Sequence, residues 1–210
     1  MKNKINIKVV NSINKFKAKD WDNCNKNGNV FLSYNFLKLL EDSNSIGGNT
    51  GWQPIYFCLK VNDKITAVVP SFIKYHSQGE FVFDHSWAQA YQSLGLNYYP
   101  KLLIASPFSP VTGKRILVTQ NINALIKKKL FDFIKDFCKE NKISSIHINF
   151  FEEYELDFLK NEGFLIRYGE QFHFINNNYS TFEDFLKTYL IKLEKISIKK
   201  EKVLNIKVLI

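Results

Sequence analysis

The chain has 210 residues, of which 45% are hydrophobic and 23% are charged, and its formal net charge is +9 at pH 7. This composition gives enough apolar surface for a packed core and excludes an intrinsically disordered chain. Much of the basic charge is local, because residues 187–210 contain seven Lys and two Glu, a net +5 that leaves +4 for the rest.

The predicted elements alternate between strands and helices. Ile5–Val9 has the apolar/polar period of a half-buried strand. Ser33 and Asn121 are expected to be helix N-caps, and Asn62-Asp63 tolerates the left-handed backbone of a tight hairpin turn. In chain order the sequence predicts a strand over 5–9, helices over 14–24 and 33–43, a loop over 45–54, strands over 55–61 and 64–74, an extended segment over 80–83, a helix over 87–94, strands over 100–105 and 115–119, a helix over 121–142, a strand over 143–151, a helix over 152–161, a strand over 164–175, a helix over 181–193 and a strand over 205–210.

This order of elements predicts a mixed α/β protein, with a central sheet covered by helices on its faces. The final strand, NIKVLI, has no later segment that could pair with it. Because an exposed strand edge favours pairing with another chain, association through this strand is expected.

The cysteines and histidines indicate a reduced protein without a metal site. Cys24, Cys58 and Cys138 are far apart and form no CxxC pair, which is typical of free thiols in the cytosol. The four histidines share no ligand spacing. No apolar stretch approaches the roughly 18 residues of a membrane span. We therefore expect a cytoplasmic protein with no transmembrane segment and no metal.

The stretch from His76 to Arg115 concentrates polar groups beside aromatic side chains, as a substrate pocket requires. If residues 80–83 are extended, Glu80 and Asp84 lie on one face and can cooperate. The candidate catalytic residues are Asp84, His85, Glu80 and His76, and the candidate substrate-binding residues are Trp52, Trp87, Tyr91, Tyr99 and His173. Structural alternatives stay open: Asp84 as a helix cap, His173 as a core histidine and Trp52 as a plug at the edge of the core.

Six motifs, spread from Phe31 to Leu186, resemble a predicted N-acyltransferase family labelled peptidoglycan biosynthesis or recognition. They are FLSYNFLKLLEDSNSIG, TGWQP, HSQGEFVFDHSWAQAY, YYPKLLIASPFSPVTGKR, GFLIRYGEQFHF and FEDFL. That family is akin to the Fem-type aminoacyl transferases. The resemblance implies a GNAT-like acyltransferase fold with a mostly antiparallel mixed sheet, and an enzyme that transfers an acyl or aminoacyl group to an amine.

The resemblance also implies the other components of the reaction. A base must take the ammonium proton, donors must stabilise the oxyanion, and the activated donor, acyl-CoA or aminoacyl-tRNA, needs a site. By analogy with the pyrophosphate loop of GNAT enzymes, Thr112, Gly113 and Arg115 are the candidate donor-binding residues, although the glycine-rich signature is absent. The acceptor would be a small-molecule or peptidoglycan-precursor amine, and tRNA a partner.

Family members are longer than this chain. The resemblance therefore implies an N-acyltransferase domain over residues 1–180 and, over 181–210, a basic helix and strand that begin a truncated second domain. A non-catalytic binding or assembly module derived from such an enzyme is the alternative function. Nucleic-acid binding by the basic C-terminal residues is a third reading, but the lysines are not interleaved with the aromatics of a stacking groove.

Overall fold

The computed structural model describes residues 4–26, 28–120, 122–188 and 204–209. The chain forms two compact units. Unit 1 contains Met1–Arg167 and Lys207–Ile210, and unit 2 contains Tyr168–Ile206. The domain boundary expected at residue 180 stays a prediction.

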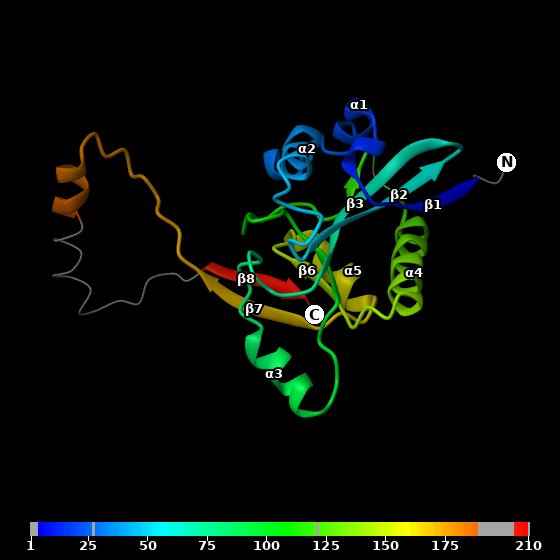
Figure 1. The fold of residues 1–210 in the computed structure, drawn as a ribbon. Helices are drawn as coiled ribbons and strands as arrows, with labels where there is room; N and C mark the ends of the chain where they lie inside the picture. Colours follow the sequence, from blue (N-terminus) through cyan, green and yellow to red (C-terminus); the bar gives the residue numbers. More distant parts are fainter. Residues whose placement is uncertain (1–3, 27, 121, 189–203, 210) are drawn as a thin grey trace. The chain divides into compact units, whose positions relative to one another are not determined.

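A mixed, mostly antiparallel sheet forms the centre of unit 1 (Figure 1). Its strands follow the order β1-β2-β3-β4-β6, and β5 pairs with β3. The β2 and β3 strands form a hairpin whose turn residues, Asn62 and Asp63, both have positive φ, as predicted. The strands are β1 (Ile5–Val10), β2 (Trp52–Val61), β3 (Lys64–Lys74), β4 (Lys101–Ile104), β5 (Leu117–Val118) and β6 (Ile146–Asn149).

The pairing of β4 with β6 is parallel, and it stops after three residue pairs, of which Ile104 opposite Ile148 is the last. Beyond the end of β6, Phe151 forms a parallel bridge with Gly113 and no longer lies opposite β4. The segment 107–115, called the turn below, therefore lies at the carboxyl ends of the two parallel strands. Crevices at the carboxyl ends of parallel strands are common ligand sites in α/β proteins.

Helices cover both faces of this sheet because side chains alternate along its strands. Phe57 and Leu59 face a core that includes Ile134 of α4, whereas Tyr56 and Cys58 face a second core that includes Trp21 of α1. The helices of unit 1 are α1 (Ala18–Asp22), α2 (Tyr34–Asp42), α3 (His85–Ser93), α4 (Ala124–Glu140) and α5 (Leu156–Asn161), and the 3-10 helices are η1 (Ile13–Lys15), η2 (Val30–Leu32) and η3 (Glu153–Glu155).

Several element ends differ from the sequence prediction. Ser33 caps α2 as expected, with Oγ accepting from Phe36 N at 3.3 Å. Asn121 lies outside the described residues, and the cap of α4 is Asn123, whose Oδ1 accepts from Ile126 N at 2.9 Å. The helix expected over 14–24 is shorter, since η1 and Lys17 precede α1. The types of these elements agree with the prediction, whereas their ends differ.

The β7 (Ile166–Gln171) and β8 (Leu204–Leu209) strands replace the longer predicted strand over 164–175 and the predicted final strand. Within unit 1, Val208 and Leu209 pair antiparallel with β6. The last strand is therefore paired within its own chain, which removes the unpaired edge from which association was expected. Oligomerisation stays a prediction.

Unit 2 contains a short helical segment over residues 182–188. Its aromatic side chains contact one another, with the ring of Phe185 near those of Phe174, Tyr179 and Phe182. Across the described residues of both units, no helix is both long and apolar enough to cross a bilayer.

The loop before β2 lies close to residues 75–78, and a glycine makes this close approach possible. Gly51 has φ +73°, and a Cβ atom there would lie 2.2 Å from His76 Nε2. The imidazole cannot easily give way, because Nε2 contacts Thr50 O at 2.9 Å and Nδ1 accepts from Gln78 N at 3.2 Å. Gly51 thus allows the close approach of these two segments.

We expect Gly51→Ala to destabilise the protein more than Gly95→Ala. Gly95 has a similar φ of +71°, so in both variants the left-handed backbone lowers the stability by about 1 kcal/mol. In contrast to Gly51, nothing lies within 4 Å of a Cβ added at Gly95. Gly51→Ala should cost about 1–3 kcal/mol more, because it also overpacks against His76. Urea unfolding measures both, and equal losses would contradict the proposed close approach.

Candidate functional site

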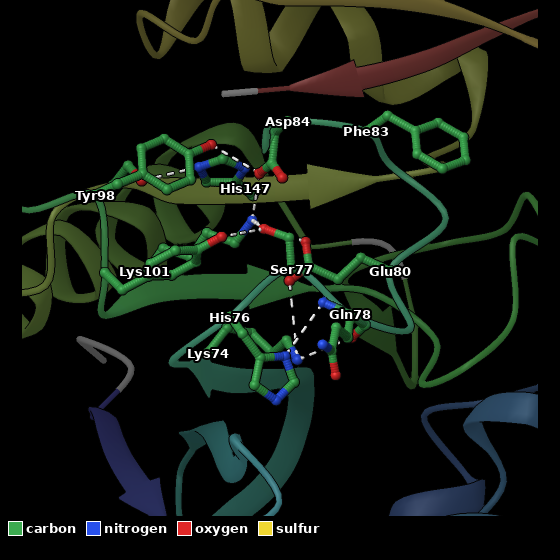
Figure 2. A network of polar contacts seen from close by, with 12 residues as sticks. Lys74, His76, Ser77, Gln78, Glu80, Phe83, Asp84, Tyr98, Lys101 and His147 are labelled. Carbon is green, nitrogen blue, oxygen red and sulfur yellow. Dashed lines mark hydrogen bonds and ion pairs between the residues drawn. The ribbon is translucent and has the colours of Figure 1, made fainter. Parts of the chain in front are cut away.

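Four charged side chains, two of them from residues 76–99, are buried together (Figure 2). The segment 76–99 is called the arm below. Lys74 and Lys101 lie opposite each other in the β3–β4 register. Glu80 and Asp84 come from the arm. Lys101 Nζ lies 2.5 Å from Asp84 Oδ2 and 2.9 Å from Glu80 Oε2, and Lys74 Nζ lies 3.9 Å from Glu80 Oε1. The predicted pairing of the two carboxylates on one face is thus combined with two lysines.

Hydroxyl groups complete the coordination of this cluster. Lys101 Nζ donates to Ser77 Oγ at 2.8 Å, and Ser77 Oγ also contacts Tyr99 Oη at 2.7 Å. Tyr98 Oη donates to Asp84 Oδ2 at 2.7 Å. Figure 2 shows Lys101 among Asp84, Glu80 and Ser77. The lysine therefore holds together three points of the arm.

Burial alternates along residues 80–84 although no strand forms there. Glu80, Val82 and Asp84 are buried, whereas Phe81 and Phe83 are exposed. Phe81 has a positive φ of 56°, which interrupts an extended backbone. Asp84 occupies the N-cap position of α3 but makes no capping hydrogen bond there. Its carboxylate is directed to Lys101 and Tyr98 instead.

Burial changes the proton affinities of the cluster in opposite directions. It lowers the pKa of Lys74 to about 7 and raises the pKa of Glu80 to about 7, since each charged form loses its hydration. Burial, the largest single influence, would raise the pKa of Asp84, but the hydrogen bonds from Lys101, Ser77 and Tyr98 and the charge of Lys101 together hold that pKa below its usual value. Near neutral pH the Lys74–Glu80 pair can therefore hold a proton on either partner, whereas Asp84 stays ionised.

His147 on β6 lies against this cluster as a neutral imidazole. Its ring is 5.9 Å from that of Tyr98, and its Nε2 contacts Ser145 Oγ at 2.9 Å. Burial, followed by the charge of Lys101, lowers the pKa of His147 to about 3. A buried, neutral imidazole of this kind fits a structural role.

The other predicted site residues lie in separate environments. His76 has both ring nitrogens in backbone contacts, and His85 is exposed on α3. Trp52 is buried, with Lys74 Nζ 3.6 Å above its ring. Trp87 is 39% exposed and lies near the guanidinium of Arg167, at 5.9 Å.

Two predicted substrate-binding residues remain. Tyr91 packs edge-on against Tyr98, with ring centroids 5.2 Å apart. His173 belongs to unit 2, where it is exposed and contacts Gln171 at 2.7 Å. The structure therefore places Tyr91 against Tyr98 of the charged cluster.

The turn contacts the arm at one end and borders a cleft at the other. Phe108 lies 4.7 Å from the ring of Trp52, and a Cβ on Gly79 would come within 2.8 Å of the Phe108 ring. At the other end, Gly113 faces Asn29, whose amide nitrogen would be 2.8 Å from a Cβ on that glycine. The cleft has a volume of about 390 Å³ and is lined by Cys24, Asn25, Asn29, Val30, Phe31, Val111, Thr112, Gly113, Lys114, Leu117 and Glu152.

Arg115 supports the turn from beneath and does not face this cleft. It is 1% exposed, and its guanidinium donates to Asn149 O and Val111 O, both at 2.6 Å. Gly113 N already donates to Phe150 O at 3.0 Å. The Thr112 hydroxyl and Lys114 remain toward the cleft, a set that does not fit a pyrophosphate, which needs several convergent donors.

Sequence reasoning missed both lysines of the cluster, the Tyr98 hydroxyl and the Asn25 side of the cleft. A lysine at either end of an apolar strand looks like a solvated terminus. One signal was present: two carboxylates on a buried face require cations, and Lys74 and Lys101 are the basic residues that flank the arm in the sequence.

Comparisons with known proteins address the fold and the family of this chain. A solved structure titled a probable acetyltransferase, from Staphylococcus epidermidis ATCC 12228, has a TM-score of 0.51 and 12% identity, covering 98% of this chain and 97% of that one. At this identity the likeness shows the fold alone, and it confirms the predicted mixed, GNAT-like acyltransferase fold. The comparison with curated proteins gave no match.

A family model provides the stronger finding. The model, described as FemAB-like, peptidoglycan biosynthesis/recognition, matches residues 12–207 of the 210. This match spans the charged cluster, the turn and the cleft, and it confirms the resemblance seen in the motifs. The chain therefore belongs to the FemAB-like family of peptidoglycan biosynthesis/recognition proteins.

Proposed function

We propose that this protein transfers an acyl or aminoacyl group to an amine of a peptidoglycan precursor in the cytoplasm. The observation that carries the proposal is the family match over residues 12–207. The acetyltransferase-like fold supports it, because the cleft lies at the carboxyl ends of a parallel strand pair. The acyl donor is acyl-CoA or aminoacyl-tRNA, and the turn lends no support to coenzyme A, since its hydrogen-bond donors do not fit a pyrophosphate.

In this reaction the neutral amine attacks the carbonyl carbon of the donor, and the thiol of coenzyme A or a ribose hydroxyl of tRNA leaves with a proton. A base must first take the proton of the ammonium group. Of the candidate residues, Glu80 with Lys74 has the proton affinity suited to this step near neutral pH. Because Glu80 is only 4% exposed, its contact with a substrate requires the arm to move away from β3 and β4.

The burial of the carboxylates favours a second candidate function, a binding module without catalysis. Glu80 and Asp84 already have lysine partners, and His76 has two backbone partners. In that case the cluster only fixes the arm, and the cleft recognises a precursor without turnover. Incubation with radiolabelled acetyl-CoA or aminoacyl-tRNA and an amine-bearing precursor separates the two functions, because only the enzyme labels the precursor.

Filling the cleft should reduce transfer without unfolding the protein. Thr112 is exposed at the cleft, so Thr112→Trp can place an indole there without entering the core. We expect at least about a tenfold loss of kcat/KM, equivalent to about 1.4 kcal/mol, measured with the labelled precursor. Gln120→Trp, an exposed position beyond β5 that does not line the cleft, is the matched control. Unchanged transfer by Thr112→Trp would remove the cleft from the reaction.

Removing the Lys101 ammonium should destabilise the protein strongly. Lys101→Met leaves the buried Asp84 without its cation, which typically costs about 3–5 kcal/mol. Lys128→Met is the control, since Lys128 pairs with Asp132 on the exposed face of α4 and such pairs contribute about 0–1 kcal/mol. Denaturant unfolding compares the two variants. Adding Asp84→Asn to Lys101→Met should restore part of the loss, and no restoration would show that the ion pair is not its cause.

A further inference from the structure

Two neighbouring lysines on α4 lie in different environments. Lys128 is exposed and forms ion pairs with Asp132 at 2.8 Å and with Glu162 at 3.9 Å. Lys127 is half-buried, and its ammonium group has no hydrogen-bond or ion-pair partner among the described residues. Its Nζ lies 4.0 Å from the centroid of the Phe158 ring instead. Lys127 is therefore partly withdrawn from water without a carboxylate in direct contact.

Lys127 also lines a small pocket, which has a volume of about 140 Å³. The other residues around this pocket are Lys114, Ile116, Val118, Ile122, Tyr154 and Glu155. Because Lys114 also lines the cleft beside the turn, the two hollows are neighbours. The aliphatic side chains give a short acyl group on Lys127 an apolar surface to contact.

The two environments have opposite effects on proton affinity. Burial lowers the pKa of Lys127, and the charge of Glu155 offsets this only in part. The hydrogen bond with Asp132 instead raises the pKa of Lys128. A lysine is nucleophilic only as the free amine, and desolvation in an apolar pocket increases the fraction in that form. The pKa of Lys74 is lowered too, but Lys74 is fully buried in the charged cluster. Lys127 combines a lowered pKa with access to solvent.

We propose that Lys127 Nζ is an acylation site of this chain, at which an acyl thioester transfers its acyl group to the protein itself. The nitrogen lone pair attacks the thioester carbonyl carbon, and the C–S bond breaks. The thiolate leaves and takes up the proton that the amine loses. The product is a neutral amide, so the reaction removes one positive charge from α4. This goes beyond the proposed function, because the acceptor is a lysine of the chain and not a precursor.

Acetyl-CoA tests this assignment in the folded full chain at neutral pH. Tandem mass spectrometry of a peptide that contains Lys127, Lys128 and Lys129 measures all three sites together, so the two neighbours are internal controls. We expect Lys127 to be acetylated at least about threefold faster than either neighbour. Equal rates, or a faster reaction at Lys128 or Lys129, would overturn the inference.

The same reaction in guanidinium chloride tests whether the preference comes from the fold. The ring contact, the pocket and the ion pairs of α4 are absent from the unfolded chain, so the three lysines should then react alike. A preference for Lys127 that persisted in the unfolded chain would be a property of the local sequence, and it would contradict the assignment.

A variant identifies the electrostatic cause. Glu155→Gln removes the carboxylate whose charge raises the pKa of Lys127, and it keeps an oxygen to accept from Arg115 N, which lies 3.4 Å from Oε2. We expect it to increase the rate at Lys127 at least about twofold and to leave Lys128 unchanged. An unchanged rate at Lys127 would count against the inference. Should this variant fail to fold, the comparison of Lys127 with its neighbours in the wild type decides.

The outcomes for this inference and for the proposed function are separable. Preferential acetylation of Lys127 without any labelled precursor supports the acylation site and contradicts the transferase. Transfer to a precursor by a chain in which Lys127 reacts no faster than its neighbours contradicts the acylation site alone.

Discussion

The ion pairs that Lys101 makes with Asp84 and Glu80 determine where the arm lies. Lys101 is at the start of β4 and Lys74 at the end of β3, so strand pairing places the two lysines opposite each other, and the arm supplies the carboxylates. With all four side chains withdrawn from water, separating Asp84 from Lys101 would leave a buried charge uncompensated. Any other position of the arm must therefore supply new partners for these charges, either water or a charged ligand.

The position of the turn depends on the hydrogen bonds of Arg115 and not on ion pairs. Arg115 bonds Asn149 O and Val111 O, and so connects the turn to the end of β6 at the place where β4 no longer pairs with it. A guanidinium suits this role because its planar array of donors can satisfy two carbonyls at fixed angles. The consequence for function is that the side of the cleft formed by the turn is anchored to β6.

The sequence predicted the types of elements well, because periodicity and caps are local properties. The β2–β3 hairpin, the Ser33 cap and the alternation of Glu80, Val82 and Asp84 all follow from neighbouring residues. The motif resemblance predicted the family and the fold. Pairings between distant segments were beyond local reasoning: no pattern places Lys101 opposite Lys74, or Asn25 across a cleft from Gly113. The arginine of the turn looked like a ligand donor, since a sequence does not show that its donors are used by the backbone.

The balance of charge within the buried cluster determines which of its carboxylates could bind a substrate ammonium group. The cluster has two lysines and two carboxylates, so a substrate ammonium that reached Glu80 would compete directly with Lys74 and Lys101 for it. That competition is weakest for Lys74, because burial lowers its pKa to about 7 and its ammonium is 3.9 Å from Glu80. With Lys74 neutral, Lys101 would be the remaining cationic partner of Glu80 among these four side chains. The electrostatics thus favour Glu80, more than Asp84, as the carboxylate that could exchange its internal partner for a substrate, since Asp84 is held by both Lys101 and Tyr98.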